Sequence, residues 1–211
     1  MTGPFARTIP SSLMLRITQC VVGLIACGVG IAVIIAADIG LAPWDVLHTG
    51  ISERTGIAVG TVIIILGVAL LALWIPLRVR PGIGTILNAV LIGWTVNVTL
   101  PLLPEPVDPV WQLVEMAVGV FVFGVGTAMY IGAGLGPGPR DGLMTGLAAR
   151  GWSLRLVRTA IEITVLVTGW ALGGSIGIGT AVFAVAIGPL VHYFLGVFGM
   201  RTSRLDFVTA D

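Results

Sequence analysis

The sequence predicts an all-α integral membrane protein with six transmembrane helices, arranged as two inverted three-helix repeats. Composition is the first reason: 10% of the residues are charged, 56% are apolar and the mean hydropathy is +1.06, whereas soluble domains carry about 25% charged residues. An internal duplication is the second. Residues 22–54 align without a gap to residues 118–150, and 15 of the 33 positions are identical. Three spans per repeat would make the second copy cross the membrane in the opposite direction.

Six apolar segments are long enough for a helix to cross a bilayer, which takes about 20 residues. They cover residues 14–37, 57–77, 82–103, 110–132, 153–173 and 177–199. Their connections are short, so we expect no soluble domain. Residues 1–211 are expected to form a single membrane domain, with repeat one at about 14–103 and repeat two at about 110–199.

The arginines lie mainly on one side of the predicted membrane domain. Ten of the eleven precede span one, flank the connections between spans two and three and between spans four and five, or follow span six; Arg54 is the exception. Because cytoplasmic loops carry an excess of Lys and Arg, we expect both termini in the cytoplasm. Trp74 and Trp152 fall at the same predicted interface, where indole rings are favoured. The net charge of +1 gives no reason to expect a nucleic-acid partner.

Each repeat continues from its first span into a turn rich in Gly and Pro, followed by a short polar helix. The glycines and prolines shared by the two copies of this motif are Gly40, Pro43 and Gly50 in repeat one and Gly136, Pro139 and Gly146 in repeat two. Proline suits the first position of a helix, where its missing N–H costs nothing. Asp45 and Asp141 then lie in the first turn, near the positive end of the helix dipole. Each helix would have about 12 residues, which is too short to span a bilayer.

Two interpretations of these short helices stay open. In one, each is an interfacial helix in a surface loop and its aspartate is structural. In the other, each is a re-entrant half-helix, and the free N–H groups of the two N-termini build a central site that accepts anions. The copies differ in side chains: Trp44 aligns with Arg140, and His48 aligns with Met144. Such a site would be symmetric in backbone and asymmetric in chemistry.

Small residues in spans one and four predict close helix packing. Gly28 and Gly30 align with Gly124 and Gly126. Because small residues let helices approach closely in lipid, we expect spans one and four to cross at these glycines.

Span five carries charged residues at membrane depth, which makes them functional candidates. Glu162 lies nine residues into the span, and Arg158 lies four residues earlier on the same helix face. The two side chains are expected to pair. They would be either a buried ion pair that stabilises packing, or a substrate-binding or proton-carrying group.

The favoured function is a small-molecule transporter or permease with a central site between the repeats. The residues expected to line that site are Trp44, Asp45, His48, Arg140, Asp141, Arg158 and Glu162. The alternative is a non-transporting accessory or regulatory protein that binds another membrane protein. The expected partners are thus the lipid bilayer, an unknown small molecule, and a membrane-protein partner or further copies of the chain.

Enzymatic chemistry is not expected from this sequence. No Ser/His or paired-Asp arrangement occurs at helical spacing, no Cys/His cluster has the spacing of metal ligands, and no phosphate-binding P-loop is present. Cys20 and Cys27 are two turns apart on one predicted helix, too far for a disulfide. We therefore expect no catalytic residue, no metal and no cofactor.

The repeated turn also resembles a known family. Gly40, Pro43, Asp45, Leu47 and Gly50 form a G-x-x-P-x-D-x-L-x-x-G pattern that is similar to the YczE/YyaS/YitT family of bacterial membrane proteins. The Trp-Asp pair in PWDVLHTG and the GIGT segments at 82–85 and 177–180 resemble the YczE-like branch. The resemblance covers nearly the whole chain and implies a polytopic protein of the bacterial plasma membrane. It carries no established catalytic residue over to this chain.

Overall fold

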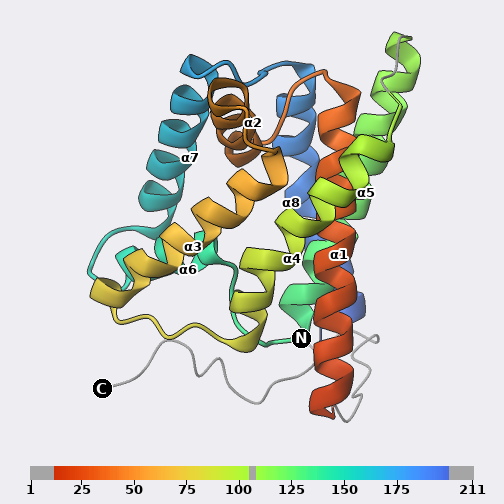
Figure 1. Cartoon of the computed structure of the whole chain (residues 1–211). Coiled ribbons are helices and arrows are strands. Elements are labelled where there is room, and N and C mark those ends of the chain that lie inside the picture. The colour runs from red at the N-terminus through yellow and green to blue at the C-terminus, as the bar shows by residue number, and fades with distance from the viewer. Residues whose placement is uncertain (1–11, 105–107, 200–211) are drawn as a thin grey trace.

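The computed structural model describes residues 12–104 and 108–199, and all regular structure in these ranges is helical (Figure 1). Long helices run along the bundle, and two short helices lie among them (Figure 1). In chain order the helices are α1 (Leu13–Ala37), α2 (Pro43–Thr55), α3 (Val59–Leu77), α4 (Ile83–Thr99), the 3-10 turn η1 (Leu100–Leu102), α5 (Pro109–Gly132), α6 (Pro139–Ala148), α7 (Leu154–Ala171) and α8 (Ile178–Phe198).

Five helices in the described ranges are long and apolar enough to cross a membrane: α1, α3, α4 with its η1 extension, α5 and α8. Each coincides with a segment expected to be a span, and the ends of helix and segment differ by only a few residues. The remaining expected span, 153–173, contains α7, which has 18 residues. Arg155, Arg158 and Glu162 make α7 less apolar than the others, so by length and composition alone it falls outside this group.

The centre of the bundle is a close crossing of α1 and α5 at glycines. A Cβ atom at Gly126 would lie 2.6 Å from the carbonyl oxygen of Gly23, and one at Gly30 would lie 2.8 Å from that of Gly119. These contacts are reciprocal, because Gly23 aligns with Gly119 and Gly30 with Gly126 in the duplication. A two-fold arrangement of two similar halves produces this kind of pairing.

The expectation that Gly28, Gly30, Gly124 and Gly126 all form this crossing is correct for Gly30 and Gly126 only. Gly28 packs instead against Thr95 of α4, and Gly124 packs against Leu190 of α8. Within each helix the two glycines are two residues apart, so they lie about 200° apart around the helix axis. They therefore contact different neighbouring helices.

A second pair of reciprocal contacts joins the halves where the repeated turns meet the GIGT segments. The amide of Gly84 donates to the carbonyl oxygen of Leu135 (2.9 Å), and the amide of Gly179 donates to that of Ile39 (2.8 Å). Gly40 (φ +112°) and Gly136 (φ +120°), which follow these carbonyls, adopt the left-handed region that favours glycine. The turn before each short helix is thus bound to a helix of the other half.

Each short helix also packs on a long helix of the other half. Gly50 of α2 lies against the backbone of Gly169 in α7. Gly142 of α6 lies against the ring of Trp74 in α3, and the indole N–H of Trp74 donates to the carbonyl oxygen of Pro139 (3.0 Å). Trp74 is 1% exposed, and its hydrogen bond holds the first turn of α6 in place.

Replacing Gly126 by valine should destabilise the protein by roughly 1–3 kcal/mol, because the new methyl groups meet backbone atoms of α1 that cannot rotate away. The thermal midpoint and the monodisperse fraction of the purified protein would report the loss. Gly196→Val is the matched control, since this glycine is also helical but has nothing within 4 Å. Equal losses for both variants would show that the α1–α5 crossing is not the tight contact described.

Candidate functional site

A cavity of about 330 Å³ lies between the two short helices and the surrounding long ones. Its size is at the lower end of the range of small-molecule sites. All seven residues expected from the sequence to line a central site do line it: Trp44, Asp45, His48, Arg140, Asp141, Arg158 and Glu162. The tertiary structure therefore brings together groups from three separate helices, α2, α6 and α7.

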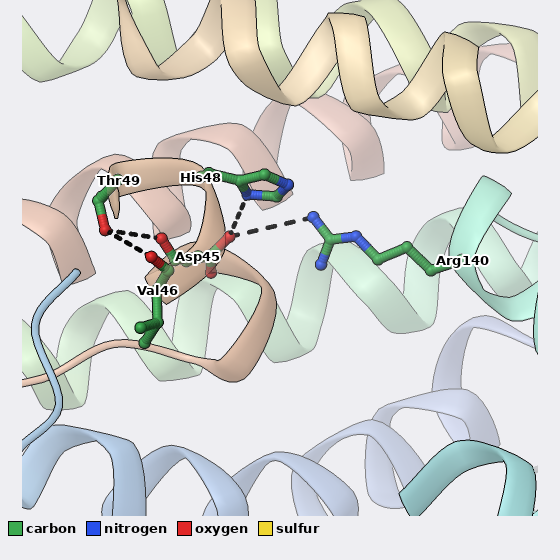
Figure 2. A network of polar contacts seen from close by, with 5 residues as sticks. All are labelled: Asp45, Val46, His48, Thr49 and Arg140. Atoms are coloured by element: carbon green, nitrogen blue, oxygen red, sulfur yellow. Dashed lines mark hydrogen bonds and ion pairs between the residues drawn. The ribbon is translucent and has the colours of Figure 1, made fainter. Parts of the chain in front are cut away.

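Asp45 and His48 form the buried side of the cavity, in the first two turns of α2. The helix begins at Pro43, as the sequence predicts, and this start places Asp45 in the first turn. Asp45 is 2% exposed and His48 is 1% exposed. Nδ1 of His48 donates to Oδ1 of Asp45 at 3.2 Å (Figure 2). This hydrogen bond gives the buried carboxylate a partner on its own helix.

Arg140 reaches across the cavity from the first turn of α6 (Figure 2). Its Nη2 atom lies 4.0 Å from Oδ1 of Asp45. Its guanidinium carbon lies 5.1 Å from the centre of the Trp44 ring, within the range of a cation–π interaction. The aligned positions 44 and 140 thus differ in chemistry and contact each other, so the first turns of the two short helices meet.

Asp141 has a partner that the sequence reasoning missed. The hydroxyl of Tyr130 in α5 donates to Oδ2 of Asp141 at 3.2 Å. Tyr130 aligns with Ile34 in repeat one. This change from an apolar to a polar residue is the feature of the sequence that could have identified Tyr130 as a site residue. Asn88 of α4 also lines the cavity and was not assigned to it from the sequence.

Arg158 and Glu162 form the expected pair on α7. Nε of Arg158 donates to Oε1 of Glu162 at 2.9 Å. The side chain of Arg158 is 65% exposed and that of Glu162 is 36% exposed. The pair is therefore not buried within the described part of the chain, and it lies at the rim of the cavity.

The two aspartates of the cavity have separate hydrogen-bond partners. Asp45 and Asp141 each have a separate partner, His48 and Tyr130, and are not hydrogen-bonded to one another. Within residues 12–104 and 108–199, no three His, Cys, Asp or Glu side chains gather as a metal site. The cavity offers carboxylates, guanidinium groups, an imidazole, an amide, hydroxyl groups and an indole ring beside apolar side chains.

Comparison with known proteins places the chain in a family. The model of a family described as "Family of unknown function (DUF6198)" matches residues 14–196. An uncharacterized protein of Haemophilus influenzae is 37% identical over 81% of this chain and 78% of its own length. The uncharacterized membrane protein YczE of Bacillus subtilis is 36% identical over 87% of this chain and 86% of its own length. The uncharacterized protein YyaS of the same organism is 27% identical over 83% of this chain and 90% of its own length.

No solved structure matches the chain. The family model nevertheless covers all of the helices described here except the last two residues of α8 and the first of α1. The relatives span most of the chain, and their match confirms the resemblance that the repeated turn and the GIGT segments indicated. The chain is a membrane protein that belongs to the DUF6198 family, and YczE and YyaS are among its relatives.

Proposed function

We propose that this protein is a small-molecule transporter or permease whose substrate site is the cavity between α2, α6 and α7. The observation that carries the proposal is the meeting of Arg140 and Asp45, because it places the first turns of two duplicated helices at one cavity. Transporters built from internal repeats place their sites at the repeat interface, next to the N-termini of discontinuous helices.

The proposed architecture is six spans in two inverted repeats. The reciprocal glycine contacts of α1 with α5 and the reciprocal hydrogen bonds at Ile39 and Leu135 support it. The sixth span would be α7, whose 18 residues extend about 27 Å along its axis. Its charged pair lines the cavity rather than the core, and charges inside a membrane are tolerated in such a position.

We propose further that α2 and α6 are re-entrant. They have 13 and 10 residues, too few to span a bilayer. The irregular backbone before each one is bound by a helix of the other half, at Ile39 and Leu135. Non-helical backbone is tolerated at membrane depth only when it is buried in protein or lines a cavity, and these turns meet that requirement.

The proposed location is the bacterial plasma membrane, with both termini in the cytoplasm. The guanidinium of Arg16, near the start of α1, donates to carbonyl oxygens of Ala133 and Gly134 after α5, and Gln19 donates to that of Phe198 near the end of α8. The two ends of the described chain therefore share one end of the bundle. Arg54 donates to the carbonyl oxygen of Leu172, which is remote from this end. This position agrees with a place on the outer side of the membrane.

A working model of transport follows from how the short helices are held. Helix α2 packs on α7 and helix α6 packs on α3, so each short helix would move with a long helix of the other half. These two units meet at Asp45 and Arg140. A substrate that competes for either charge would loosen this contact and let one unit move relative to the other.

The alternative, an accessory protein that binds another membrane protein, is favoured by α8. Its side chains Val185 and Tyr193 are 76% and 69% exposed, and Gly188 and Gly196 have nothing within 4 Å. A stoichiometric partner that co-purifies after mild solubilisation and cross-links to α8 would support this alternative and not the transporter.

Neutralising the carboxylates of the cavity should impair flux. In proteoliposomes that contain the full chain, Asp45→Asn, Asp141→Asn and Glu162→Gln should each lower the flux of a transported solute about tenfold or more, because each removes a charged hydrogen-bond acceptor. A flux screen over amino acids, organic anions, organic cations and amphiphiles would provide the readout. Glu53→Gln is the control, as this exposed acid of α2 lies outside the cavity. Native flux in all three variants for every solute would refute the proposed site.

Cysteine labelling should reveal the depth of α2. With Cys20 and Cys27 replaced by serine, a membrane-impermeant maleimide should label Glu53→Cys fully from the outside and Ala149→Cys fully from the inside, since both positions are exposed at opposite ends. Asp45→Cys should label weakly, because this position in the first turn of α2 is buried. Full labelling of Asp45→Cys from the outside would make α2 an ordinary surface helix.

A further inference from the structure

The two halves differ at the pairing of their second and third long helices. In the first half, α3 and α4 pack closely: a Cβ at Gly60 would collide with the carbonyl oxygen of Gly93, and Nδ2 of Asn97 donates to Oγ1 of Thr61 at 3.0 Å. In the second half, α7 and α8 do not pack along their lengths within the described residues. Gly188, which aligns with Gly93 when the GIGT segments are superimposed, has no atom within 4 Å. The second half is therefore open where the first is closed.

This opening leads into the cavity. Arg158 and Glu162 of α7 line the cavity from one side of the opening, and Ile187 and Gly188 of α8 line it from the other. In Figure 1, α7 lies at the left edge of the bundle and α8 behind its middle. The cavity thus has a lateral mouth between two long helices, in addition to the space beside α6.

The flanks of the mouth are apolar and exposed. Ile163 and Val167 on α7 are each 55% exposed, and Val185 on α8 is 76% exposed. In a membrane-embedded bundle such side chains face acyl chains. A ligand that passes between α7 and α8 therefore comes from the hydrocarbon layer rather than from water, and needs an apolar part of its own.

The polar end of the cavity presents opposite charges on consecutive residues. The guanidinium of Arg140 donates no hydrogen bond within the described part of the chain, and its contact with Asp45 is at 4.0 Å, so its donors are free for an anionic group. Asp141 is exposed to the cavity and accepts one hydrogen bond, from Tyr130, which leaves acceptor capacity for an ammonium group. A head group that carries both charges satisfies both side chains.

We propose that the ligand is an amphipathic zwitterion, with an anionic group at Arg140, an ammonium group at Asp141 and an apolar tail that leaves through the mouth between α7 and α8. The apolar walls that would accept the start of the tail are contributed by Leu66 and Leu70 of α3, Phe123 of α5, and Phe183 and Ile187 of α8. This inference rests on the proposed function and specifies the substrate class of the same site.

The test is equilibrium binding of radiolabelled dodecylphosphoethanolamine, below its micellar concentration, to the full chain in dodecyl maltoside. Binding should saturate at one site, and unlabelled dodecyl phosphate, dodecylamine and phosphoethanolamine should each compete at least tenfold more weakly, since each lacks one of the three recognised parts. Arg140→Gln and Asp141→Asn should each weaken binding about tenfold or more. Displacement by phosphatidylethanolamine would assign the ligand to the bilayer's own lipids, and failure to displace would assign it to a single-chain amphiphile.

The mouth is tested separately by Gly188→Trp, which places a large side chain in the opening. The variant should bind at least tenfold more slowly, and Gly196→Trp, equally free of neighbours on the same helix, should bind like the native protein. Gly188→Leu provides a milder block if the tryptophan variant does not fold. Native binding kinetics in both position-188 variants would overturn the lateral route, as would cross-linking of Gly188→Cys to another polypeptide in membranes.

If dodecylphosphoethanolamine binding does not saturate but a water-soluble solute shows carboxylate-dependent flux, the ligand class is wrong and the transporter proposal survives.

Discussion

The close backbone approach of α1 and α5 is the contact on which the remaining architecture depends. Lipid tails are as apolar as leucine side chains, so helices in a membrane gain little by hiding apolar surface from one another, and packing contacts must hold them together. Glycines at 23, 30, 119 and 126 remove the side chains that would keep the two backbones apart. With α1 and α5 locked, α4 and α8 pack against their outer faces at Gly28 and Gly124. The two repeated turns then come within hydrogen-bonding reach of the opposite halves.

The short helices show how a duplication can build one site from two copies of a motif. Each is held by a long helix of the other half, and their first turns meet. Because positions 44 and 140 diverged to Trp and Arg, the meeting is an attractive stacking contact and not the juxtaposition of two identical groups. The buried carboxylate of Asp45 is tolerated because His48 and Arg140 share its charge, which offsets the cost of removing it from water.

Several departures from symmetry distinguish α3 and α4 from their counterparts α7 and α8. Trp74 clamps α6, whereas its aligned residue Trp170 is 63% exposed. Gly93 packs against Gly60, whereas its counterpart Gly188 meets nothing. Helix α3 carries no charged residue, whereas α7 carries Arg155, Arg158 and Glu162. The first half thus supplies a closed wall, and the second supplies both the charged rim and the opening.

The sequence by itself determined the all-helical membrane class, the positions of the long helices, the start of each short helix at a proline and the pairing of Arg158 with Glu162. These features depend on composition, helical periodicity and local spacing, which are properties of neighbouring residues. It also named seven of the side chains that line the cavity. Only the tertiary structure decided that Gly28 and Gly124 face α4 and α8, that Trp74 is buried against α6, and that Tyr130 bonds to Asp141. Each of these depends on which face of a helix meets which neighbour, and in an apolar helix nearly every face looks alike in sequence.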